Sequence, residues 1–256
     1  MNEPILTVRD VSKRFGGLAA LTDVSFDVRE ASVQSIIGPN GSGKTTLFNI
    51  ISGLLRPDRG EIKLRGQPIQ SLASHRIAGL GIGRTFQDTR LFPNLTILEN
   101  IELAGYKQSQ TGLLQVLLGT PRARDERKAV RERAEQLLCE IGGGRLYPRR
   151  FDLPHTCSLG EQRILELIRV LLLDPDIVMM DEPTQGLNPT WVKEMLALIE
   201  EIRLRGKTIL FIEHKMSVVM RISDRVVALN SGQVISEGTP QAVRHDPRVI
   251  EAYLGE

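Results

Sequence analysis

The sequence has few cysteines, no long apolar run and no recognisable export signal. Its two cysteines, Cys139 and Cys157, are too few for a disulfide framework, and their spacing matches no metal site. The first residues lack a basic segment followed by an apolar stretch, so no signal peptide is predicted. The longest apolar stretches, such as 170–173 and 177–180, fall far short of the roughly 20 residues that a membrane-spanning helix needs. We therefore expect a soluble, cytoplasmic chain that reaches a membrane only through a partner.

An excess of charge of one sign is also absent. The 256 residues include 33 Lys and Arg and 31 Asp and Glu, which leaves a net charge of +2. Because nucleic-acid-binding domains usually carry a basic excess or a basic stripe, we expect no nucleic-acid partner. With 41% hydrophobic and 25% charged residues, the composition is that of a globular protein, which argues against disorder and collagen-like structure.

The two ends of the chain show two kinds of strand pattern. Near the start, apolar and polar residues alternate, for example over 5–8 and 24–28, which predicts strands with one exposed face. Towards the end, short apolar runs at 177–180, 209–212 and 226–229 alternate with predicted helices. Continuous apolar strands between helices indicate a parallel sheet that is covered on both faces.

The middle of the chain is predicted to be helical. Helices are expected over 96–106 and 129–141, and Cys139 in the second helix is expected in the core. The segment 107–121 between them resembles an insertion. The predicted fold class is therefore α/β, with an antiparallel β region at the start, an α/β core and an inserted α-helical subdomain. We assign a single domain to 1–256, its core subdomain to 1–88 plus 161–256, and its helical subdomain to 89–160.

A phosphate-binding loop lies between a predicted strand at 33–37 and a predicted helix. Residues 38–45 match the pattern G-x-x-x-x-G-K-[ST], in which glycines let backbone N–H groups approach phosphates. The Lys44 ammonium is expected to bind the β- and γ-phosphate oxygens, and the Thr45 hydroxyl is expected to coordinate Mg²⁺. The following helix points its positive end at the nucleotide. The predicted nucleotide-binding residues of this loop are Gly38, Pro39, Asn40, Gly41, Ser42, Gly43, Lys44, Thr45 and Thr46.

An apolar strand that ends in two carboxylates supplies the second half of the site. Asp181 and Glu182 follow the run 177–180, at the sheet edge where ligands of open α/β sheets bind. The Asp181 carboxylate is a candidate ligand of Mg²⁺, and the Glu182 carboxylate is a candidate to polarise the water that attacks the γ-phosphate. The sequence separates Lys44 from Asp181 by 137 residues (181 − 44), whereas one crossover needs only about a dozen. The two strands are candidates for neighbours in the sheet, and the long intervening chain argues against a compact nucleotide kinase.

With these motifs in this order, the chain resembles the ATP-binding-cassette (ABC) ATPases over essentially its whole length. The resemblance implies a P-loop NTPase core that binds ATP and Mg²⁺. It implies that Phe15 stacks on adenine and that Gln87 and His214 join Glu182 in catalysis. Gln87 would also join Thr45 and Asp181 at Mg²⁺. In the motif 158–162 it implies that Ser158, Gly160 and Glu161 face the ATP held by the other subunit of a dimer.

The sequence departs from the family pattern at this dimer motif. The motif usually reads Leu-Ser-Gly-Gly-Gln, whereas residues 157–161 read Cys-Ser-Leu-Gly-Glu. The aspartate expected in the loop 184–188 is Asn188. Ser158 remains a candidate N-cap for a helix that begins near Gly160. These departures concern the contacts between subunits rather than nucleotide binding.

Several stretches narrow the resemblance to the ATPases of branched-chain, hydrophobic amino acid uptake systems. They are 17–21, 84–87, 91–92, 111–114 and 246–255. The implied role is to power a bacterial importer from the inner face of the cell membrane. The implied partners are a second ABC ATPase in a homo- or heterodimer, two membrane permeases and, indirectly, an extracytoplasmic solute-binding protein. The alternatives are a urea or amide importer, a lipopolysaccharide exporter and a non-transport regulatory ABC ATPase.

The family also implies a groove that receives a short permease helix after Gln87. An exposed apolar patch is expected at such a docking site. Four residues could supply it, namely Leu91, Phe92, Leu95 and Ile97.

Overall fold

Two β-sheets and a group of helices make up the chain in the computed structural model, which describes residues 3–85, 90–105 and 120–254. One sheet is antiparallel and has the strand order β2-β1-β4-β5. Its strands are β1 (Leu6–Phe15), β2 (Leu18–Val28), β4 (Arg59–Leu64) and β5 (Gln67–Pro68). The predicted antiparallel region at the start of the chain is therefore confirmed.

The second sheet has six strands in the order β10-β9-β3-β8-β7-β6. They are β3 (Val33–Ile37), β6 (Ile82–Arg84), β7 (Ile177–Asp181), β8 (Thr208–Ile212), β9 (Arg225–Asn230) and β10 (Gln233–Gly238). Pairing is parallel throughout, except that β10 runs antiparallel to β9. Strand β8 lies between β3 and β7, so the two strands that carry the predicted site are not neighbours.

The parallel sheet is covered on both faces, as its apolar strands predict. Every residue of β3, β7 and β8 is buried. Along β7 the side chains alternate between two cores. Val178 and Met180 join the core formed with the helices, and Ile177 and Met179 join the core beneath the antiparallel sheet. A strand with two buried faces needs apolar side chains at successive positions, which explains the unbroken run.

The helices of the described residues are α1 (Lys44–Ile51), α2 (Ser74–Gly79), α3 (Ile97–Gly105), α5 (Pro121–Ile141), α6 (Leu159–Leu171), α7 (Pro189–Leu204), α8 (Met216–Ile222), α9 (Pro240–Arg244) and α10 (Pro247–Leu254). Of these, α1, α3, α6 and α7 begin within about two residues of the predicted positions, α5 begins earlier, and α2, α8, α9 and α10 were not predicted. Two short 3-10 turns, η2 (Tyr147–Arg149) and η3 (Pro154–Thr156), lie between α5 and α6. Helix α5 starts eight residues before the predicted 129 and is capped by Thr120.

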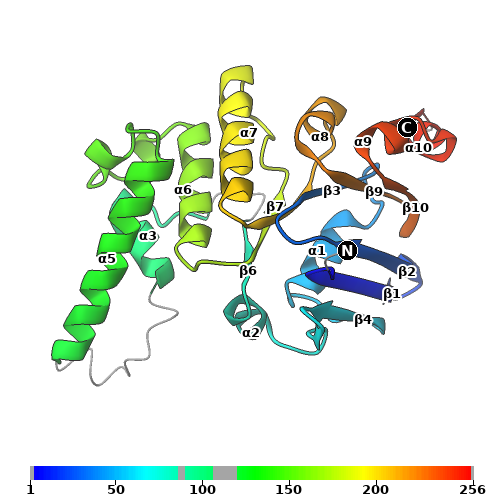
Figure 1. Cartoon of the computed structure of the whole chain (residues 1–256), viewed down its shortest axis with the longest axis horizontal. Coiled ribbons are helices and arrows are strands. Elements are labelled where there is room, and N and C mark those ends of the chain that lie inside the picture. The colour runs from blue at the N-terminus through cyan, green and yellow to red at the C-terminus, as the bar shows by residue number, and fades with distance from the viewer. Residues whose placement is uncertain (1–2, 86–89, 106–119, 255–256) are drawn as a thin grey trace.

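Helices α3, α5 and α6 gather at one side of the molecule, and the antiparallel strands lie at the other side (Figure 1). Helix α6 packs against both α3 and α5. The subdomain boundaries at 88/89 and 160/161 stay predictions, and the first of them falls outside the described residues. Of the predicted insertion 107–121, residues 107–119 also lie outside the described residues.

Two further observations bear on the sequence predictions. Cys139 is exposed, so its predicted place in the core is wrong, whereas Cys157 is buried. Among the described helices, none combines the length and the apolar composition that crossing a membrane requires.

Candidate active site

The phosphate loop connects the buried strand β3 to the first residue of α1. The backbone of Gly38 passes so close to β9 that a Cβ there would lie 2.1 Å from the Leu229 carbonyl oxygen. The Lys44 ammonium, which is 7% exposed, donates to the carbonyl oxygens of Gly38 and Pro39 at 2.7 Å each. The amide of Gly232, in the turn after β9, donates to the Ser42 carbonyl oxygen at 3.1 Å. The loop is therefore held both by its own lysine and by the turn beside it.

The outer side of this loop is open. Asn40, Gly41 and Thr45 are exposed, and Thr46 is half-buried. Gly43 is the N-cap of α1 and has no side chain to accept from the first amides of the helix. Uncapped amides at a helix start attract anions, so the loop presents the donors that a triphosphate needs.

Strand β7 delivers the predicted Mg²⁺ ligand Asp181 to the buried edge of the sheet. Its side chain pairs with Arg84 of β6, with Nη2 and Oδ2 3.2 Å apart, and both groups are buried. Burial raises the pKa of Asp181, and the neighbouring guanidinium and Lys44 oppose that rise. Arg84 also donates to Asn49 Oδ1 and Ser52 Oγ of α1 and its C-cap at 2.8 Å each, so it ties α1, β6 and β7 together.

Glu182 and His214 lie together, as the sequence predicts for two residues of one site. The Glu182 Oε1 atom is 3.6 Å from Nδ1 of His214. The Oε2 atom of Glu182 is buried and has no hydrogen-bond partner among the described residues. The backbone of Glu182 has a φ of +50°, a strained value for a residue with a side chain. A strained, partly buried carboxylate with a spare acceptor suits a group that positions water.

Glu213 fixes the loop that carries His214 and was not predicted as a site residue. It is fully buried. Its Oε1 accepts from the amides of His214 and Lys215 at 2.9 and 3.0 Å, and its Oε2 accepts from the Thr184 hydroxyl. The carboxylate thus joins the loop after β8 to the loop after β7. The available signal in the sequence was a carboxylate directly after an apolar strand.

The predicted dimer motif forms the amino end of α6. Ser158 is the N-cap, as predicted, and it forms a capping box with Glu161. Gly160 faces the ring of Trp191 in α7, where a Cβ would lie 2.1 Å from Cδ2. Asn188 caps α7 by accepting from the amides of Thr190 and Trp191, a role that the aspartate of the family pattern would fill equally well. Helix α6 lies on the far side of the parallel sheet from α1, so one chain does not bring these residues to its own phosphate loop (Figure 1).

The remaining predicted residues have different outcomes. Phe15 ends β1 and is 47% exposed, with the Lys13 ammonium 5.7 Å from the ring centroid. Gln87 lies outside the described residues.

In the predicted docking patch Phe92 is 47% exposed, but Ile97 is fully buried, so Ile97 belongs to the core rather than to the patch. Leu91 and Leu95 are half-buried.

The chain is similar in sequence and structure to known ATP-binding cassettes. Residues 21–185 match the family model "ABC transporter", and residues 233–256 match "Branched-chain amino acid ATP-binding cassette transporter". The high-affinity branched-chain amino acid transport ATP-binding protein LivG of Salmonella typhimurium is 43% identical over 100% of both chains.

Two solved structures share the fold. One is the ADP conformation of an ATP-binding cassette of an ABC transporter, with a TM-score of 0.86 and 32% identity over 100% of both chains. The other is a dimeric post-hydrolysis ATP-binding cassette bound to ADP and phosphate, with a TM-score of 0.76 and 26% identity over 92% of this chain and 98% of that one. The chain therefore belongs to the ABC transporter family and is one of its ATP-hydrolysing subunits.

Proposed function

We propose that the chain powers an importer of branched-chain amino acids. The match of residues 233–256 to the branched-chain amino acid model carries this choice of solute, because that segment lies outside the general cassette match. It favours amino acid import over the urea, amide and lipopolysaccharide alternatives. The presence of Lys44, Asp181, Glu182 and His214 favours an active ATPase over a regulatory cassette.

In this proposal each half of the site has its own task. Lys44 and the amides at the start of α1 bind the β- and γ-phosphates. The Thr45 hydroxyl and the Asp181 carboxylate would hold Mg²⁺, and their hard oxygen donors fit that ion. When bound, Mg²⁺ neutralises charge on the phosphates. Glu182 orients the attacking water and accepts its proton, beside His214. Gln87 and Phe15 keep the roles that the family resemblance implies.

The proposed assembly places a second ATP-binding cassette against the phosphate loop. Support comes from α6, whose buried residues pack in the core of the helical group, whereas α1 packs in the core beneath the antiparallel sheet. The second cassette is either another copy or a related subunit. Two membrane permeases and, indirectly, an extracytoplasmic solute-binding protein complete the transporter. The chain would lie in the cytoplasm, on the inner face of the membrane.

Glu182→Gln tests the catalytic part of the proposal. We expect ATP hydrolysis to fall by roughly 10²–10⁴-fold, since a general base contributes that much, while equilibrium ATP binding is kept. Glu132→Gln on the exposed face of α5 is the matched control, because Glu132 is exposed and forms an ion pair with Lys128 at the surface. Hydrolysis at the parental rate in Glu182→Gln would exclude the proposed role.

The solute is tested in cells that carry Glu182→Gln in place of the parental chain. We expect them to lose uptake of radiolabelled leucine, isoleucine and valine and to keep uptake of urea. Loss of urea uptake alone would favour the amide alternative.

A further inference from the structure

The amino end of α6 carries an acidic side chain at a position that is proposed to meet phosphate. Glu161 stands where the family motif has glutamine. A carboxylate in the first turn stabilises the helix through the helix dipole. The same charge opposes any anion that approaches these amides, because a helix start attracts anions only while its positive potential is uncompensated. A free Glu161 carboxylate would therefore weaken the proposed contact with ATP.

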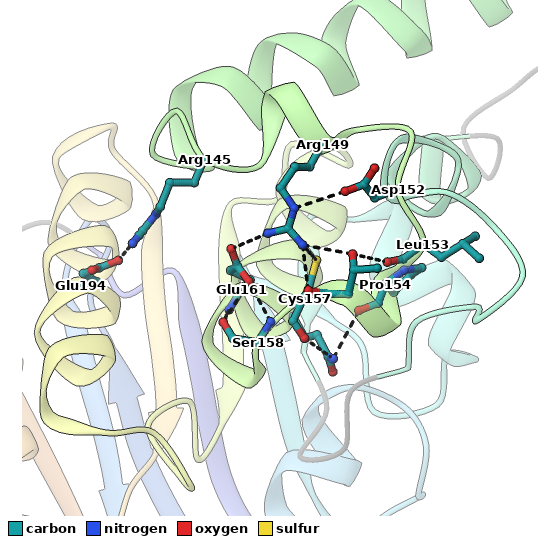
Figure 2. A network of polar contacts seen from close by, with 11 residues as sticks. Arg145, Arg149, Asp152, Leu153, Pro154, Cys157, Ser158, Glu161 and Glu194 are labelled. Carbon is teal, nitrogen blue, oxygen red and sulfur yellow. Dashed lines mark hydrogen bonds and ion pairs between the residues drawn. The ribbon is translucent and has the colours of Figure 1, made fainter.

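Arg149 removes this conflict by pairing with Glu161. Its Nη1 donates to Oε1 of Glu161 at 3.0 Å, and the two side chains are 33% and 12% exposed. The other carboxylate oxygen of Glu161 accepts from the amide and hydroxyl of Ser158 at 2.7 and 3.0 Å. Figure 2 shows the Glu161 carboxylate between Arg149 and Ser158. Both oxygens are thus held within this network, and the negative charge is matched by the guanidinium.

The same guanidinium also shapes the backbone just before the motif. Nη2 of Arg149 donates to the carbonyl oxygen and hydroxyl of Thr156 at 2.8 and 3.0 Å. Its Nε donates to Asp152 at 3.3 Å. The buried Cys157 lies next to this group, with Sγ 3.9 Å from Nη2. One planar side chain thus connects η2, the turn at η3 and the start of α6, which a lysine cannot do because it lacks the rigid fork.

This arrangement is anchored to the rest of the helical region. The amides of Ile97 and Leu98, at the start of α3, donate to the carbonyl oxygens of Asp152 and Arg150 at 2.9 Å each. Arg149 is therefore held in place by backbone contacts that do not involve its own side chain.

We propose that Arg149 is a positioning residue of the dimer motif, which neutralises Glu161 so that the amino end of α6 can accept the triphosphate bound by a second cassette. This inference rests on the proposed function of Ser158, Gly160 and Glu161. The pairing gives the glutamate at this position of the motif a partner for its charge.

The test compares Arg149→Gln, Glu161→Gln and the double variant in the hydrolysis-deficient Glu182→Gln chain. The measurement is the midpoint of MgATP-dependent association in analytical ultracentrifugation, for the chain alone and with the second ATP-binding subunit of its transporter. We expect Arg149→Gln to weaken association by roughly tenfold to hundredfold, because an unpaired carboxylate then faces phosphate. We expect the double variant to associate to within about threefold of Glu161→Gln, which restores the glutamine usual in this motif.

Arg149→Gln and the double variant both lose the hydrogen bonds to Thr156, but only Arg149→Gln leaves the Glu161 carboxylate unpaired. A difference in association between these two variants therefore reports the charge of Glu161 and not a change in the backbone before α6. Arg205→Gln is the matched control, because Arg205 also bridges two carboxylates, Glu140 and Glu201, but at the far end of α7. If Arg149→Gln associates normally, or if the double variant is as weak as Arg149→Gln, the inference is wrong. If the Glu182→Gln parent binds ATP but never associates, the proposed function itself fails.

Discussion

At the scale of single residues, the phosphate loop contains Lys44, which would meet the nucleotide as well as hold the loop, and Gly43, which serves the fold of the chain. The Lys44 ammonium donates to two carbonyl oxygens of the loop. Gly43 has a φ of +100°, and a Cβ there would lie 2.6 Å from the Ala20 carbonyl oxygen and 2.7 Å from a methyl group of Leu21. Glycine is therefore required at 43 by the fold of the chain itself, whether or not phosphate approaches.

Substitutions at these two residues are expected to differ in what they damage. Lys44→Ala removes a charge-assisted contact to phosphate, so ATP affinity should fall by roughly tenfold to hundredfold. Its thermal midpoint should fall less than that of Gly43→Ala, since the lost contacts to the Gly38 and Pro39 carbonyl oxygens lie within the loop itself. Isothermal titration with MgATP and calorimetric unfolding measure the two quantities. Unchanged ATP affinity in Lys44→Ala would contradict a loop that binds phosphate.

Gly43→Ala contrasts with Lys44→Ala, because it is expected to lower the stability of the folded chain rather than chiefly its affinity for ATP. The added methyl group meets backbone and side-chain atoms of β2 in an unfavourable φ region, so unfolding should become easier by about 1–3 kcal/mol. For a chain of this size that lowers the melting temperature by about 2–4 °C per kcal/mol. A normal melting temperature with weak ATP binding would show that the contact with β2 is unimportant.

Local motifs could be predicted residue by residue, whereas partners from distant segments could not. The phosphate loop, the Ser158 cap and the two carboxylates after the strand 177–180 follow from short patterns with a chemical reason, whereas His214 was indicated only by the family resemblance. Arg84 contacts Asp181 across 97 positions of sequence, and Glu213 contacts Thr184 across 29, so no local pattern reveals either pair. Cys139 follows the buried Leu138 but lies about 100° further round the helix, which turns it to solvent.

At the scale of elements, apolar periodicity found the long helices and the buried strands but missed the short helices α2, α8, α9 and α10, and it gave neither the order of the strands nor the full length of α5. The first half of α5 is rich in charge and has no apolar stripe, so only the half that packs against the core was predicted. The runs that form β3, β7 and β8 are equally buried, and nothing in their composition places β8 between the other two. Strand order depends on how the helices cross over, which periodicity does not encode.

The contact between α6 and α7 is fixed by Gly160 against Trp191. Trp191 also lies under the Arg145 guanidinium, 4.7 Å from the ring centroid, and Arg145 forms an ion pair with Glu194 (Figure 2). The amino ends of both helices thus depend on one small residue. Any side chain at 160 must push the indole ring away and tilt the dimer motif.

Gly160→Ala should therefore destabilise the chain by about 1–3 kcal/mol through overpacking. Trp191 is the only tryptophan in the sequence, so its fluorescence emission reports directly on this contact. We expect Gly160→Ala to shift the emission maximum and lower the melting temperature, and Gly160→Ala/Trp191→Leu, which has no tryptophan, to recover the melting temperature. Gly79→Ala in α2 is the control, since a Cβ there meets nothing within 4 Å. Parental fluorescence and stability in Gly160→Ala would refute the packing argument.

At the scale of the whole molecule, a cavity of about 390 Å³ lies where the helical group meets the core. Its lining includes Arg84 of β6, Leu103 of α3, and Glu166 and Arg169 of α6. Arg169 also lies over the Phe92 ring, 5.8 Å from its centroid. Phe92 is therefore an exposed apolar side chain beside a cavity-lining arginine, which fits the docking of an apolar helix from a permease.

Phe92→Asp should leave folding and ATP binding by the isolated subunit nearly unchanged and should prevent its co-purification with the permeases. Folding is expected to survive because the backbone at 92 is held by Asn100, which accepts from the Phe92 amide at 2.7 Å and donates to its carbonyl oxygen at 3.0 Å. Leu204→Asp, at an apolar residue that is 72% exposed at the end of α7, is the matched control and should co-purify normally. An aspartate at 92 opposes insertion of an apolar helix because a charge buried without a partner is costly. Transport and co-purification that survive Phe92→Asp would rule out docking at this surface, and unfolding of the variant would assign Phe92 to the core.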